Sequence, residues 1–188
     1  MRPPSAKRHS GNKISELHLY QVRNNINGAH HLAFLKIGST YLKCAIGRTG
    51  RKALKREGDG ASPLGRFQLV TLFYRPDRQR RPTCLTSTKA LRPDFGWCDH
   101  VGHGQYNRFI VKPFAARHED LWRIDHVYDL VFTINHNSRP RINGAGSAIF
   151  MHLAHTDYQP TAGCVALPLE DLRRLLPRLA ARVWLTIH

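Results

Sequence analysis

The stretch Val127-Tyr-Asp-Leu-Val-Phe-Thr-Ile134 is a run of β-branched, aromatic and aliphatic residues interrupted by one acid, and this composition is typical of a buried strand. A loop rich in Asn, Gly and Pro covers residues 135–146, and a second apolar run, Ser147-Ala-Ile-Phe-Met-His152, ends in a histidine. Cys164-Val-Ala-Leu167 is a third strand-like run. Three such runs without a helical pattern between them predict a β-sheet.

Strand-like patterns also fill the rest of the chain. The turn residues Gly38-Ser39-Thr40 separate two β-rich runs and therefore predict a hairpin. Two long basic stretches, 47–65 and 75–93, contain many Gly or Pro residues and are predicted to be loops. Alternating or β-rich composition predicts the remaining strands at 17–22, 31–37, 41–46, 67–74, 109–114 and 183–187.

One convincing helix is expected near the C-terminus. Pro168 stands at its start, acids occupy its first turn and arginines follow late, as the helix dipole favours. Pro177 is expected to kink or stop it. The helix is amphipathic because an apolar stripe repeats at helical spacing through Leu169, Leu172, Leu175, Leu176 and Leu179.

The fold class is therefore mainly β, a sandwich or barrel-like pair of sheets with one packed C-terminal helix. The 188 residues are enough for one domain with a core that needs no disulfide or metal. Residues 1–13 are expected to be a short, basic, disordered leader, and residues 14–188 the domain. No apolar stretch is long enough for a membrane span, and the leader lacks the apolar core of a secretion signal.

The chain is strongly basic, with 29 Lys and Arg against 13 Asp and Glu and a net charge of +16. Such a surface attracts polyanions, so the basic loops are candidates for binding nucleic acid, anionic lipid or an acidic cell-wall polymer. A module that binds nucleic acid without catalysis is a competing interpretation. It is disfavoured because the bases lie in loops and on one helix face, without a zinc-finger, helix-turn-helix or RNA-binding motif.

The cysteines and histidines do not form a metal-binding pattern. Cys44, Cys84, Cys98 and Cys164 include no pair at C-x-x-C spacing, and their low density argues against a disulfide framework. His155 lies near His152 and Cys164, but further ligands for zinc are missing. We therefore expect no metal and no cofactor.

The chemistry is expected at His152 and Cys164. A thiol becomes a good nucleophile when a neighbouring imidazole takes its proton, and the imidazole can later protonate a leaving amine. Gly163 permits a sharp turn, so the N–H groups of Gly163 and Cys164 are candidates for an oxyanion hole. Each residue alone also fits a structural role, as a buried core cysteine or histidine.

Three stretches together resemble the catalytic domain of the L,D-transpeptidases, bacterial cysteine enzymes that cross-link peptidoglycan. They are Gly58-Asp-Gly-Ala-Ser-Pro-Leu-Gly-Arg-Phe67, Ile149-Phe-Met-His152 and Thr161-Ala-Gly-Cys164-Val165. The resemblance implies a β-sandwich in which Cys164 is the nucleophile and His152 the proton donor and acceptor. It also implies that a nearby carbonyl, of Leu153 or Ala154, orients the imidazole, and that the substrate lies in a periplasm or cell envelope.

The substrate site is less sharply predicted. Tyr106, Asn107, Arg108 and Thr161 are the candidate substrate-binding residues. The family usually has polar residues where this chain has Ala162 and Ala166, so the acceptor is open. Acyl transfer between peptidoglycan stem peptides through a thioester is the first hypothesis, with 3→3 cross-linking or D-amino-acid exchange as the outcome. Hydrolysis of the same peptides by the same Cys/His pair, as a carboxypeptidase or amidase, is the alternative.

Overall fold

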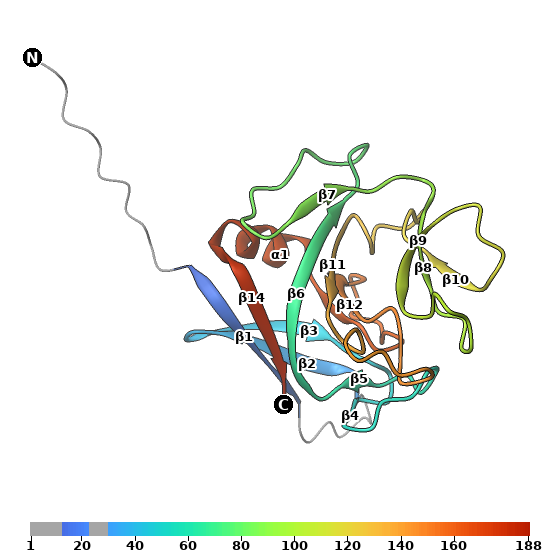
Figure 1. Ribbon diagram of the computed structural model, residues 1–188. Helices are drawn as coiled ribbons and strands as arrows, with labels where there is room; N and C mark the ends of the chain where they lie inside the picture. Colours follow the sequence, from blue (N-terminus) through green and yellow to red (C-terminus); the bar gives the residue numbers. More distant parts are fainter. Residues whose placement is uncertain (1–12, 23–29) are drawn as a thin grey trace, which may run out of the picture.

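The structure is a computed structural model that describes residues 13–22 and 30–188. The expected leader therefore lies, except for Lys13, outside the described residues. The chain folds mainly into strands with a single short helix near its C-terminus (Figure 1), which confirms the predicted class. None of the described helices is long and apolar enough to cross a membrane.

The elements follow one another along the chain in fourteen strands, one α-helix and one 3₁₀ turn among the described residues. They are β1 (Ile14–Gln21), β2 (Leu32–Ile37), β3 (Thr40–Ala45), β4 (Arg51–Lys52), β5 (Ser62–Pro63), β6 (Gly65–Tyr74), β7 (Thr88–Ala90), β8 (Phe95–Cys98), β9 (Arg108–Val111), β10 (His118–Asp120), β11 (Leu130–Ile134), β12 (Phe150–Leu153), β13 (Val165–Leu167), α1 (Leu169–Leu175), η1 (Leu176–Arg178) and β14 (Leu179–Ile187).

The main sheet closes on itself. Its strands run in the order β11-β12-β13-β3-β2-β1-β14-β6-β7, and β11 pairs in addition with β6. The long strand β6 makes this possible because it pairs with β14 over its first half and with β11 over its second half. The hairpin β2–β3 is the one that Gly38-Ser39-Thr40 predicts. A separate three-stranded sheet, in the order β10-β8-β9, stands beside β11 and β12 (Figure 1).

Strand β11 is buried along its whole length because both of its faces are covered. Leu130 and Phe132 point into the large core inside the closed sheet, and Val131 points into a second cluster on the outer side. Side chains alternate between faces along a strand, so one apolar run serves both clusters. This explains why the sequence at 130–134 is apolar at every position except Thr133, rather than alternating.

The helix packs its leucine stripe onto the large core and ends where expected. Leu172 and Leu175 are buried in that core. At Pro177 the backbone tightens into η1, and β14 begins directly afterwards at Leu179. The predicted last strand, 183–187, is therefore too short at its start.

Several strands depart from the predicted pattern. The basic loops contain the short strands β4, β5 and β7, and β8 and β10 lie in segments for which no strand was expected. These strands are two to four residues long, too short for periodicity to reveal. Their pairing partners lie far along the chain or across a loop, so tertiary contacts rather than local propensity define them.

Leu69→Ala is expected to lower the free energy of unfolding by about 2–5 kcal/mol, because Leu69 is 1% exposed and its truncation leaves a cavity in the large core. The neighbouring Val70, which is 44% exposed on the other face of β6, is the matched control. Val70→Ala should change stability by about 0.5 kcal/mol or less. Urea unfolding of both variants is the measurement, and equal losses would contradict this assignment of faces.

Candidate active site

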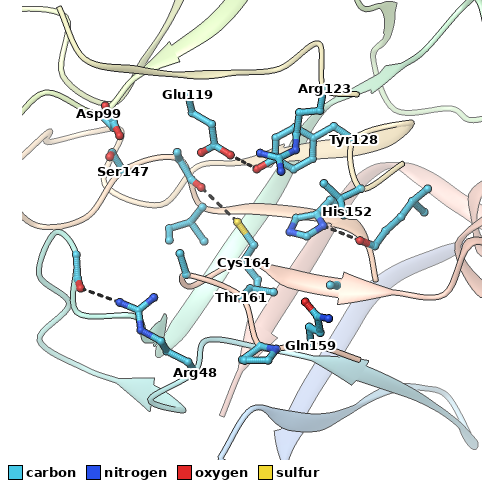
Figure 2. A pocket seen from close by; sticks show the side chains of 18 of the residues that line it. Arg48, Asp99, Glu119, Arg123, Tyr128, Ser147, His152, Gln159, Thr161 and Cys164 are labelled. Atoms are coloured by element: carbon cyan, nitrogen blue, oxygen red, sulfur yellow. Dashed lines mark hydrogen bonds between the residues drawn. The ribbon is translucent and has the colours of Figure 1, made fainter. Parts of the chain in front are cut away.

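A pocket of about 270 Å³ lies between the main sheet and the three-stranded sheet, and its lining includes Cys164, His152 and Thr161. His152 is on β12, and Cys164 immediately precedes β13. These two strands are parallel neighbours in which Met151 pairs with Val165. Figure 2 shows the thiol and the imidazole on the same wall of the pocket.

Strand alternation directs His152 into this pocket. Met151 and Leu153 belong to the large core, whereas Phe150 belongs to the second cluster together with Cys164. His152 follows Phe150 by two positions, so both side chains leave the same face of β12. The core therefore fixes the orientation of the catalytic candidate without any special local motif.

The thiol of Cys164 is 7% exposed and is held by the backbone on either side of it. Its Sγ–H donates to the carbonyl oxygen of Ala148 at 3.3 Å, and Sγ accepts the N–H of Phe150 at 3.3 Å. Burial raises the pKa of the Cys164 thiol to about 12, and nearby Glu119 acts in the same direction. The Cys164 side chain is thus a neutral thiol.

The imidazole of His152 is fixed by one hydrogen bond to the main chain. Its Nδ1 lies 2.9 Å from the carbonyl oxygen of Leu153, and because a carbonyl only accepts, Nδ1 carries the proton. Nε2 is then left as the basic atom. Of the two carbonyls that the family resemblance implies, the one bonded is that of Leu153. Burial lowers the pKa of His152 to about 4, so the resting base is neutral.

Two hydroxyl groups shape the turn that carries the nucleophile. Thr161 Oγ1 accepts the N–H of Gly163 at 3.1 Å and donates to the carbonyl of Cys164 at 2.7 Å. Ser62 Oγ donates to the carbonyl of Gly163 at 2.7 Å and accepts the N–H of Gly47 at 3.0 Å. The Ser-Pro motif at β5 therefore stabilises the turn that carries Cys164.

Gly163 is required by space and by backbone conformation. Its φ is +143°, and a Cβ at this position would lie 2.7 Å from the carbonyl oxygen of Ala61. Its N–H, which was expected to hold an oxyanion, is engaged by Thr161 within the turn. Among the described residues no acceptor is recorded for the N–H of Cys164.

Tyr106, Asn107 and Arg108 stand outside the lining of this pocket. Tyr106 is buried and its hydroxyl donates to Glu57 Oε2 at 2.5 Å. Asn107 is also buried, and it fastens Trp97 and the backbone of Ala148, whose carbonyl holds the thiol. Tyr106 and Asn107 directly precede β9, and the side-chain amide of Asn107 donates to backbone carbonyls. Arg108 is exposed and lines a separate groove.

The structure adds pocket residues that the sequence did not single out. Glu119 comes from β10, and Arg123 and Tyr128 come from the segment between β10 and β11. Arg48, from the first basic loop that the sequence marked as a candidate for binding anions, also lines the pocket. The Tyr128 hydroxyl donates to Glu119 Oε1, and its ring packs edge-on against the His152 ring at 5.2 Å. No pattern in the sequence pairs these residues, because their contacts depend on how the small sheet docks.

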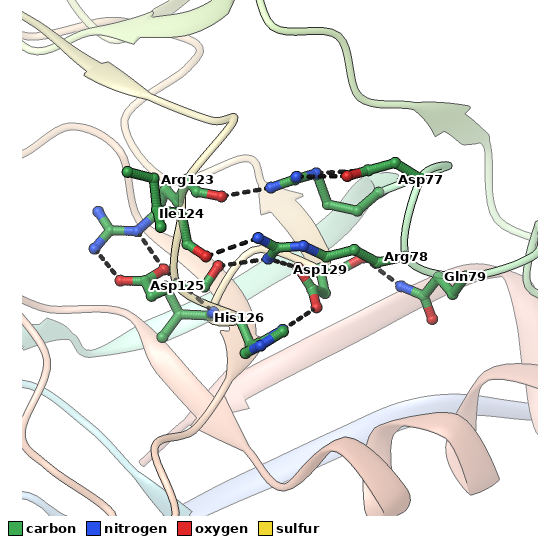
Figure 3. A network of polar contacts seen from close by, with 10 residues as sticks. Asp77, Arg78, Gln79, Arg123, Ile124, Asp125, His126 and Asp129 are labelled. Carbon is green, nitrogen blue, oxygen red and sulfur yellow. Dashed lines mark hydrogen bonds and ion pairs between the residues drawn. The ribbon is translucent and has the colours of Figure 1, made fainter.

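Ion pairs hold the segment that carries Arg123 and Tyr128 (Figure 3). Arg78 bonds Asp129 at 2.7 Å and also the carbonyls of Ile124 and Asp125. Arg123 makes a bidentate pair with Asp125 at 2.9 and 2.6 Å. The second basic loop thereby anchors one wall of the pocket.

Other chemistry is not built into this region. The four cysteines are free thiols. Within residues 13–22 and 30–188, no group of three or more His, Cys, Asp or Glu side chains is arranged to hold a metal ion.

The site combines a buried thiol that follows a glycine turn with a histidine on the neighbouring parallel strand, and the Nδ1–H of that histidine is fixed by a main-chain carbonyl. This arrangement agrees with the family that the sequence resembles. A family model described as YkuD, the L,D-transpeptidase catalytic domain, matches residues 22–186. The chain belongs to this family. L,D-transpeptidase domains of this kind are enzymes that act on peptidoglycan, so peptidoglycan is the substrate class implied for this chain. The comparison with curated proteins finds no match.

The low pKa of His152 predicts a pH-dependent stability. The folded state disfavours protonated His152, whereas the unfolded chain takes up the proton below about pH 6.5. The free energy of unfolding is therefore unaffected by this titration above pH 6.5, and it decreases by about 3 kcal/mol as the pH falls toward 4. Chemical unfolding of wild type and His152→Gln between pH 7 and pH 4 measures it.

His152→Gln should flatten this profile, because the amide side chain does not titrate. His30→Gln is the control, since His30 is exposed, lies outside the pocket that holds His152 and should leave the profile unchanged. An equally steep loss of stability in wild type and His152→Gln would show that His152 is not the group that titrates.

Proposed function

We propose that this protein transfers acyl groups between peptidoglycan stem peptides through a thioester on Cys164. The observation that carries the proposal is the placement of Cys164 and His152 in one pocket, with the Nδ1 of His152 committed to Leu153 and its Nε2 left as a base. The L,D-transpeptidase family supplies the substrate class. The donor is a tetrapeptide stem that ends in D-Ala.

In the first step His152 Nε2 takes the thiol proton while Sγ attacks the carbonyl that follows the L-centre of the stem's diamino acid. The N–H of Cys164, which has no recorded acceptor, stabilises the oxyanion that forms. Collapse of this intermediate breaks the peptide bond, and protonated His152 gives its proton to the departing D-Ala amine. The product is a thioester on Cys164 and free D-Ala.

In the second step an amine of another stem attacks the thioester. His152 takes the proton of that amine, the thiolate leaves and is reprotonated, and a new peptide bond gives a 3→3 cross-link. A D-amino acid in place of the second stem gives exchange. Water in its place gives a tripeptide and free enzyme.

The pKa values of the pair bear on how the thiol is activated. With the pKa of Cys164 near 12 and that of His152 near 4, proton transfer in the empty pocket is unfavourable. The proton therefore moves as the new C–S bond forms, when the charge passes to an oxyanion that the Cys164 N–H stabilises. The buried thiol is thus protected from solvent until a substrate is present.

Hydrolysis is the second candidate, favoured by the alanines of the pocket. Ala162 and Ala166 both line it, and neither offers a polar side chain to hold an acceptor amine. Water needs no such contact.

Arg48 lies at the edge of the pocket, where its side chain donates only to the carbonyl of Gly58 among the recorded bonds, and it is proposed to hold a stem carboxylate. The exposed bases of the two loops are proposed to hold the protein on anionic wall polymer.

Incubation of the purified protein with disaccharide-tetrapeptide, followed by mass spectrometry of the products, tests the function. Wild type is expected to release D-Ala and give cross-linked dimers, and Cys164→Ala should give neither, because the thioester cannot form. Tripeptide monomers without dimers would instead establish the hydrolase.

Cys98→Ala is the matched control. Cys98 is also buried, and its Sγ lies 3.9 Å from Nδ1 of His103, so it is a second Cys/His pair outside the pocket. Its loss should leave product formation unchanged. Release of D-Ala by Cys164→Ala at the wild-type rate would refute the proposal.

A further inference from the structure

The charged groups of the pocket are unevenly partnered. Lys55 is paired with Asp59 at 2.5 Å, and Arg123 is paired with Asp125. These two cations therefore already have a carboxylate partner. Glu119, in contrast, has no ion pair among the described residues and is bonded only by the hydroxyl of Tyr128. Arg123 acts on Glu119 electrostatically but forms its ion pair with Asp125. In a chain with a net charge of +16, a carboxyl group beside Cys164 that makes no ion pair of its own is unexpected.

One oxygen of Glu119 is left for a ligand. Tyr128 occupies Oε1, and no bond to Oε2 is recorded. No buried side-chain oxygen or nitrogen among the described residues lacks a partner, so Oε2 is not sealed inside the protein and meets the open pocket that Glu119 lines. Figure 2 shows Glu119 above Cys164, with Arg48 on the opposite side of the thiol.

We propose that Glu119 is the specificity-determining residue that binds a primary ammonium group of the substrate through Oε2. The inference rests on the proposed function for its substrate class, a peptide stem. Within that class it selects stems whose attacked residue carries a second, cationic amine on its side chain. The acceptor amine is the other source of an ammonium group, and the experiment separates the two.

Two physical effects favour this pairing. A partly desolvated carboxyl gains more from an ammonium partner than an exposed one does, because water no longer screens the pair; burial raises the pKa of Glu119, which is the sign of that desolvation. The charge of Glu119 also contributes to the high pKa of Cys164. A bound ammonium cancels this charge, so the correct substrate eases ionisation of the thiol that attacks it.

The test compares two stem peptides that differ only in the side-chain amine of the attacked residue, which is replaced by hydrogen in one of them. Release of D-Ala with water as acceptor is measured for wild type, Glu119→Gln and Asp120→Asn. Gln at position 119 keeps an oxygen for Tyr128 and removes only the charge. Asp120→Asn is the matched control because it removes the same charge from the next residue of β10. The Asp120 side chain lies on the opposite face of that strand, where it pairs with Lys112 at 2.5 Å.

Wild type and Asp120→Asn are expected to prefer the amine-bearing peptide by about 10- to 100-fold in kcat/KM, as a charge-assisted hydrogen bond provides. Glu119→Gln should prefer neither peptide. An equal preference in Glu119→Gln, or no preference in wild type, would overturn the inference. A preference seen only when an amine acceptor is added would assign the ammonium to the acceptor.

Calorimetric binding of the same peptides to the Cys164→Ala protein separates this inference from the proposed function. If Cys164→Ala binds the amine-bearing peptide more tightly and Cys164→Ala/Glu119→Gln does not, Glu119 recognises the ammonium even if wild type releases no D-Ala. If neither peptide binds, or both bind equally to both proteins, the inference is wrong whatever the activity of wild type.

Discussion

The pairing of β12 between β11 and β13 is the constraint on which the site depends. Register with β11 and β13 is set by the apolar side chains that Met151 and Leu153 place in the core. Once this register is fixed, His152 can only face the pocket, and the parallel start of β13 brings Cys164 to the N–H of Phe150. A shift of one residue would exchange the core and pocket faces of β12 and remove the histidine from the site. Packing of Met151 and Leu153 in the core thus fixes the position of His152 relative to Cys164.

Burial imposes a second constraint, because both members of the reactive pair are neutral when the pocket is empty. The thiol donates to the carbonyl of Ala148, a residue held at a φ of +50°, and Asn107 fastens the N–H of that same residue. Non-glycine residues in this conformation cost about 1 kcal/mol or more and persist where surrounding contacts hold them. The thiol of Cys164 is therefore held by a backbone that the β8–β9 region keeps in place, and its hydrogen bonds go to that backbone rather than to His152.

The sequence could predict the features that depend on local pattern. Largely apolar runs indicated β11 and β12, the turn at Gly38 indicated the β2–β3 hairpin, and the leucine stripe with Pro177 indicated the helix and its end. The histidine and cysteine were identified from their residue types and from the family motifs. The sequence pattern could not show that Thr161 accepts a hydrogen bond from the N–H of Gly163, or that the side chain of Asn107 is hydrogen-bonded to Trp97 and to backbone groups. Nor could it show that β10 brings Glu119 to the pocket. Each of these depends on contacts between segments that are distant in sequence or on hydrogen bonds that periodicity does not encode.

The central claim is that the pocket thiol, and no other cysteine, carries the acyl group. Intact-protein mass spectrometry after brief mixing with a tetrapeptide stem, followed by digestion at acidic pH and peptide mapping, tests this most directly. The account predicts one added tripeptide-stem acyl group, located on the peptide that contains Cys164, together with one released D-Ala. An acyl group on Cys44, Cys84 or Cys98, or turnover without any covalent adduct even in rapidly quenched samples, would contradict it.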